Sequence, residues 1–171
     1  MTIADRIIAR ITRRAPDFII GGAARPYLRR WWVIPRNPFF NVYLHEFLRS
    51  DDDRALHDRP WANASILLRG SYIEHTIAAG GIERAEELTA PAMRVRWSGR
   101  LAHRIELSRS IGIDISDRIK AAVFEWPCWT LFITGPRYRE WGFHCPRIGW
   151  VHWKLFTAAD DIGAIGRGCD Q

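Results

Sequence analysis

Residues 93–108 read MRVRWSGRLAHRIELS, and this stretch decides the fold class. On both sides of its central Ser-Gly pair, uncharged residues alternate with charged ones. A period of two is typical of a strand with one buried face, because successive side chains of a strand point to opposite sides of the sheet. The stretch therefore predicts two strands. The alternating residues are Met93, Val95 and Trp97 in the first and His103, Ile105 and Leu107 in the second.

Similar short runs occur along most of the chain, and turn-forming Gly, Pro, Asn and Asp separate most of them. Eight such runs without long helices between them indicate an all-β sandwich, jelly roll or barrel. The predicted strands span 27–34, 39–48, 64–69, 71–77, 93–97, 101–108, 129–134 and 150–156.

Two helices and a tail are also expected. Isoleucines recur at helical spacing within residues 1–14, with arginines largely on the other side, which predicts a short amphipathic helix that ends at Pro16. A second helix is expected within 111–123, capped by Asp114 or Ser116. We therefore divide the chain into an N-terminal arm (1–20), one β-barrel domain (21–156) and a flexible C-terminal tail (157–171).

The composition fits one globular domain, with 171 residues of which 47% are hydrophobic. The three cysteines are odd in number and lack the paired spacings of zinc ribbons and disulfide frameworks, which predicts free thiols in a reducing compartment. The sequence carries no secretion signal and no apolar run of membrane-spanning length, so we expect a cytoplasmic protein.

The formal net charge is +6, and nearly all of the positive charge is Arg. Arg favours anionic partners, because its planar fork binds carboxylate and phosphate bidentately. A basic nucleic-acid or partner-binding module is one interpretation of this charge and of the basic first helix. The sequence holds no recognised nucleic-acid motif, so we rank that interpretation last.

The segment HDRPWANASILLRG, residues 57–70, resembles the first motif of the cupin superfamily. That motif is His-x-His, three or four residues, Glu, six residues and Gly. His57, Arg59, Asn63 and Gly70 stand at these positions, so the spacing is intact while the second His and the Glu are replaced.

The segment WSGRLAHRIEL, residues 97–107, is similar to the second cupin motif. Gly99 and His103 match it, whereas Trp97 replaces a Pro and one extra residue precedes the His. The later stretch WTLFITGPRYREWGFHCP resembles uncharacterised bacterial and phage cupin-like proteins. The resemblance implies a double-stranded β-helix, the cupin-type jelly-roll barrel, which often forms a homodimer that covers exposed sheet edges.

For function, the resemblance first implies a metal-dependent enzyme of the dioxygenase or isomerase type, with Fe, Mn, Zn or Ni. His57 and His103 are then the catalytic residues and the surviving metal ligands. A guanidinium at Arg59 opposes such a metal, because two positive groups roughly 5 Å apart at an effective dielectric near 20 repel by about 6 kcal/mol. A metal could still bind in one of three ways: the Arg59 side chain turns away, an anion bridges it to the metal, or His45, Asp58 or His144 supplies a replacement ligand.

The alternative is a metal-free site similar to that of sugar epimerases with the same barrel. His57 and His103 then act as acid, base or hydrogen-bond partner, because neutral imidazole does this near pH 7. Arg59, Asn63 and Arg69 are then the ligand-binding residues for a small molecule, which is expected to be an anion such as a carboxylate or a phosphate, or a sugar.

Overall fold

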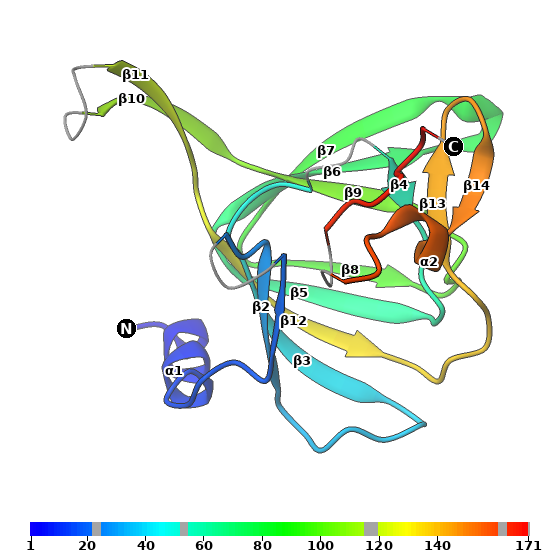
Figure 1. Cartoon of the computed structure of the whole chain (residues 1–171). Helices are drawn as coiled ribbons and strands as arrows, with labels where there is room; N and C mark the ends of the chain where they lie inside the picture. The colour runs from blue at the N-terminus through cyan, green and yellow to red at the C-terminus, as the bar shows by residue number, and fades with distance from the viewer. Residues whose placement is uncertain (22–24, 52–54, 115–119, 161–163, 171) are drawn as a thin grey trace.

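The computed structural model describes residues 1–21, 25–51, 55–114, 120–160 and 164–170 (Figure 1). Two antiparallel sheets of six strands face each other, and a two-stranded hairpin projects from them. The first sheet has the order β1 (Phe18–Ile20), β2 (Leu28–Trp32), β3 (Asn41–Phe47), β12 (Cys128–Thr134), β5 (Asn63–Arg69) and β8 (Ala92–Arg96). The second has the order β14 (Gly149–His152), β13 (Gly142–Cys145), β4 (Leu56–His57), β9 (His103–Leu107), β6 (Ser71–Ile77) and β7 (Glu83–Thr89).

The strand order is that of a jelly roll. Strands β3, β4, β5 and β6 pair with β12, β9, β8 and β7 respectively, so that each pair lies one step nearer to the turn between β6 and β7. Successive pairs alternate between the two sheets. A long hairpin rolled up in this way is the double-stranded β-helix, and the predicted fold class is confirmed. The sheets are not closed into a barrel, because β1 and β8 remain edges of one sheet and β14 and β7 remain edges of the other.

The prediction of a helix within 111–123 is wrong. The chain forms an antiparallel hairpin there, of β10 (Arg109–Asp114) and β11 (Lys120–Glu125), which projects away from the sheets (Figure 1). β-Branched residues such as Ile111 and Val123 favour a strand over a helix, and this local preference prevails. The proposed cap Ser116 lies outside the described residues.

The N-terminal helix is confirmed as α1 (Ile3–Ile11). Thr2 and Asp5 form a capping box, in which the Thr2 hydroxyl accepts a hydrogen bond from the Asp5 N–H at 3.1 Å. The helix packs its buried Ile8 against Trp31 and Trp129 on the outer face of the first sheet. The domain itself thus covers the part of the apolar stripe around Ile8, while Ile3 stays exposed. No helix among the described residues has the length and apolar character that crossing a membrane requires.

The main core lies between the sheets at the end where β5 passes into β6, and it includes Leu67, Leu107 and Cys128. A second cluster surrounds Phe156, the last residue of α2 (Trp153–Phe156), whose ring stacks on Phe143 at 3.7 Å between centroids. The open end of the jelly roll between these two clusters holds the cavity described below.

The segment expected to be a flexible tail lies against the second cluster. The N–H groups of Gly166 and Gly168 donate to the Phe156 carbonyl oxygen, and Cys145 forms a disulfide with Cys169. The prediction of free thiols is therefore wrong for these two cysteines, because β13 brings two residues 24 positions apart into contact. Only Cys128 is free. The disulfide also removes the observation on which a reducing compartment was predicted.

Candidate functional site

The two histidines singled out in the sequence meet as a cross-strand pair. His57 on β4 is the register partner of His103 on β9, and the ring centroids lie 5.0 Å apart. Both side chains are buried and line a cavity of about 160 Å³ between the sheets. This is the size of cavity that holds a benzene-sized molecule. The structure thus brings these residues together, and their chemical roles stay predictions.

The cavity wall carries more positive than negative charge. Its basic residues are Arg30, Arg49, Arg59 and Arg96, and its acidic residues are Asp51 and Glu74. A third histidine, His45 on β3, lies in the same wall and accepts a hydrogen bond at 2.9 Å from the Arg30 Nε. Aromatic rings complete the lining, at Tyr27, Phe47, Trp61, Tyr72, Phe132, Trp141, Phe143 and Phe156.

A buried ion cluster fixes the orientation of His103. The Glu74 Oε1 on β6 lies 2.8 Å from the His103 Nδ1 and also accepts a hydrogen bond from the Arg96 Nη2 on β8. Because a guanidinium only donates, the Arg96 Nη2 at 3.3 Å from that same Nδ1 is a neighbour rather than a second partner. Glu74 therefore holds the proton on Nδ1, which leaves the Nε2 lone pair directed toward the cavity.

Arg59 occupies the position in front of that lone pair. Its Nη2 lies 3.5 Å from the His103 Nε2, and its guanidinium carbon lies 5.9 Å from the centre of the Phe132 ring. Its buried Nε has no hydrogen-bond partner among the described residues. Arg59 thus enters the cavity with donor capacity that the protein does not use.

Burial keeps all three cavity histidines neutral. Desolvation lowers the pKa values of His45, His57 and His103 well below 6.5. Nearby arginines also lower them, foremost Arg30 for His45, Arg59 for His57 and Arg96 for His103. Burial conversely raises the pKa of the Asp51 carboxyl. At neutral pH the three rings are therefore hydrogen-bond partners without charge, and the positive charge of the cavity comes from Arg.

The donor set does not fit the metal that cupins commonly hold. No group of three or more His, Cys, Asp or Glu side chains among the described residues is arranged to bind an ion, and a tight divalent site normally has at least three protein ligands. The Arg59 Nη2 lies 3.5 Å from the His103 Nε2, and its positive charge would oppose a cation bound to that nitrogen. Two of the proposed replacement ligands, Asp58 and His144, do not line the cavity. Asp58 accepts from the Gly142 N–H and pairs with Arg139, and His144 lies beside Asp58.

Asn63 and Arg69 do not share the cavity wall. Asn63 is buried beside Arg96 and Thr134, its register partners, and its side-chain amide has no hydrogen-bond partner among the described residues. Arg69 lies on the outer face, where its guanidinium carbon is 5.5 Å from the centre of the Trp129 ring. A β-bulge between β5 and β12 reverses the alternation before Arg69, which places it on the side of α1.

The alternation in β8 predicts that its apolar face is buried, but the structure buries the face that carries the arginines. Arg96 is 7% exposed, whereas Met93 is 61% and Trp97 is 87% exposed. The arginine face turns inward because Glu74 offers its carboxylate across the cavity, to Arg96 and, at 3.6 Å, to the Arg94 Nε. Neither Glu74 nor Arg96 was predicted from the sequence. The available signal was that Glu74 and the buried Tyr72 are two residues apart and so share a face of β6.

No protein-family model and no curated protein matches the chain. Solved structures do match. A conserved protein of unknown function from Streptococcus pyogenes is 7% identical over 66% of this chain and 76% of its own length, with a TM-score of 0.42.

Two further matches are cupin-fold enzymes. Hydroxypropylphosphonic acid epoxidase from S. wedmorenis is 12% identical over 71% of this chain, with a TM-score of 0.46. A variant of oxalate decarboxylase from B. subtilis is 14% identical over 66%, with a TM-score of 0.42. This chain spans 57% of the epoxidase and 26% of the decarboxylase. The strand order of the chain itself is that of a jelly roll. At these identities the likeness concerns the fold alone.

Proposed function

We propose that the chain binds a small organic carboxylate in the cavity between its sheets, without a metal ion. The single observation that carries this proposal is the position of Arg59, which points a donor-rich guanidinium at the His103 Nε2 inside a cavity that has four arginines and two acids. A carboxylate satisfies a guanidinium bidentately and neutralises its charge.

The lining favours an anion with an apolar body. Eight aromatic residues contribute to the wall, and the volume of about 160 Å³ suits a molecule near the size of one benzene ring. The neutral His57 ring lies beside His103 and is available as a hydrogen-bond partner for a second polar group of the ligand. A probe such as benzoate combines both features.

Binding is better supported than proton abstraction. A general base works best when its pKa lies near the working pH, and the pKa values of His57 and His103 lie well below 6.5. A cavity that keeps both imidazoles neutral makes them weak bases. The epimerase-like activity is therefore not part of this proposal.

A thermal-shift series with formate, acetate, oxalate, benzoate and inorganic phosphate tests the proposal. We expect carboxylates to raise the melting temperature of the wild type, because a ligand of the folded state stabilises it by mass action. Arg59→Gln should lose the shift, whereas Arg13→Gln, a change at an exposed arginine of the N-terminal arm, should keep it. Equal shifts in the two variants would show that the cavity is not the site.

A further inference from the structure

A second hollow lies on the outer side of Arg30, and its lining is basic without acidic residues. Its volume is about 390 Å³, and it is bounded by β2, β3, the connection between them and the residues that follow β12. Arg30, Arg36 and Arg137 line it, and none of its described lining residues is Asp or Glu. It shares Arg30 and Trp61 with the inner cavity.

Arg30 carries a positive charge that no Asp or Glu of the described residues pairs with. Among the described residues, no carboxylate oxygen forms an ion pair with it, and its Nε donates to the neutral His45 ring. Its guanidinium carbon lies 4.9 Å from the centre of the Tyr43 ring. Burial, together with the smaller effect of the neighbouring Arg59 and Arg36, lowers its pKa to about 10. An anion placed here would relieve this repulsion.

The rest of the hollow supplies rings and further donors. The Arg36 guanidinium carbon lies 5.5 Å from the centre of the Trp32 ring. The buried Trp61 Nε1, an N–H donor, has no hydrogen-bond partner among the described residues. Arg137 is paired with Glu140, but both side chains are more than half exposed, and such a surface pair is separated at little cost.

We propose that this hollow, the outer site, binds the phosphate group of a small phosphorylated molecule that has a planar ring. A phosphate monoester offers three acceptor oxygens and close to two negative charges, which suits three arginines and one indole N–H. The rings of Trp32 and Trp61 provide flat apolar surfaces for the remainder of the ligand. The outer site does not rest on carboxylate binding in the inner cavity.

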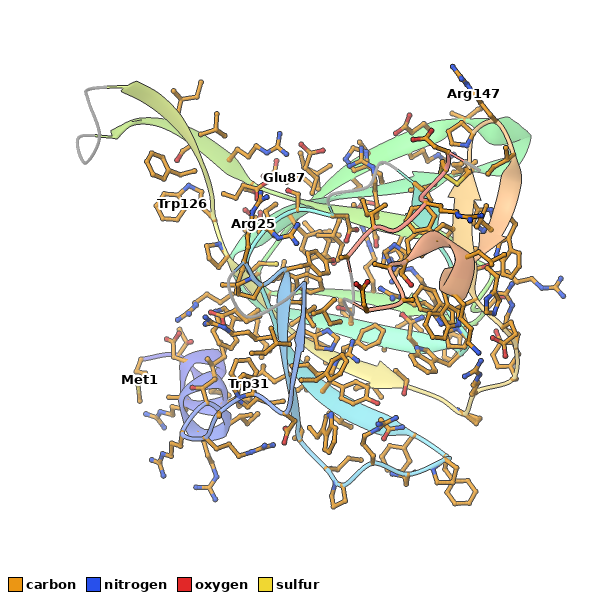
Figure 2. The ribbon with its side chains drawn as sticks, in the orientation of Figure 1. Met1, Arg25, Trp31, Glu87, Trp126 and Arg147 are labelled. Carbon is orange, nitrogen blue, oxygen red and sulfur yellow. A yellow bond between two sulfur atoms is a disulfide. The ribbon has the colours of Figure 1, made fainter. Side chains whose placement is uncertain are left out.

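Calorimetric titration with phenyl phosphate at low salt tests the outer site. We expect the wild type to bind it, with phenol showing no binding because it lacks the phosphate. Arg36→Gln and Arg137→Gln should each weaken binding about tenfold or more, as expected for the loss of one charged donor. Arg147→Gln is the matched control, since Arg147 lies at the tip of the β13–β14 hairpin and points away from the body (Figure 2). Its affinity should equal that of the wild type.

Three results would overturn the outer site. The first is no heat of binding with the wild type. The second is equal weakening by Arg147→Gln and Arg36→Gln, which would show a diffuse effect of net charge. The third is loss of binding in Arg59→Gln with retention in Arg36→Gln and Arg137→Gln, which would place the phosphate in the inner cavity. Carboxylate binding by Arg59→Gln is a separate readout, so the two proposals fail independently.

Discussion

Replacing Glu74 with Gln should lower the free energy of unfolding more than a surface change does, because the Glu74 carboxylate offsets buried positive charge. The Glu74 and Arg96 side chains are 6% and 8% exposed, and the carboxylate also holds His103. Removing one partner of a buried pair leaves the other charge uncompensated, which costs about 3–5 kcal/mol. For a chain of this length the melting temperature should fall by roughly 10 °C.

Urea unfolding followed by circular dichroism measures this effect. Glu87→Gln is the control, because Glu87 lies exposed on β7 and forms no ion pair with a described residue (Figure 2). It should cost less than about 0.5 kcal/mol. The double variant Glu74→Gln with Arg96→Gln should recover part of the loss, since both charges are then absent. A cost for Glu74→Gln no larger than for Glu87→Gln would refute the buried ion cluster.

Two further predictions concern stability. His45, His57 and His103 have folded-state pKa values below the unfolded value of 6.5, so the unfolded chain binds more protons and their stabilisation is lost as pH falls below 6.5. Unfolding free energies in urea should fall by up to about 4 kcal/mol from pH 7.5 to 5.5, and a constant value would contradict their neutral burial. Cys169→Ser should lower the unfolding free energy by about 3 kcal/mol, because it opens the loop closed with Cys145. A reductant should lower the unfolding free energy of the wild type to that of Cys169→Ser, which would show that the disulfide forms in solution. If neither the reductant nor the substitution changes the unfolding free energy, the disulfide does not form.

Much of the fold follows from patterns in the sequence. Alternation predicts strands such as β9, where His103, Ile105 and Leu107 are all buried. It fails where charge replaces hydrophobicity, as in β7, whose sequence ERAEELT lies almost wholly exposed at a sheet edge and has no apolar face. The hairpin of β10 and β11 was also not predicted. In the described structure these two strands pair with each other in a separate sheet.

The site could be predicted only in part, for a physical reason. His57 and His103 were found because motif spacing and strand parity both place them inside. The face of a strand that turns inward depends on partners distant in sequence, and β8 illustrates this: Arg96 is buried because Glu74 lies opposite it. Arg69 illustrates the other failure, since a one-residue bulge reverses its face and leaves no mark in the alternation.

Calorimetric titration of benzoate, in the presence of EDTA, into wild type and Arg59→Gln tests the central claim most directly. We predict that the wild type binds without added metal and that Arg59→Gln weakens binding at least tenfold, because the carboxylate loses its charged partner. The claim would be contradicted if benzoate bound only after iron, manganese, zinc or nickel was supplied, or if Arg59→Gln bound it as tightly as the wild type.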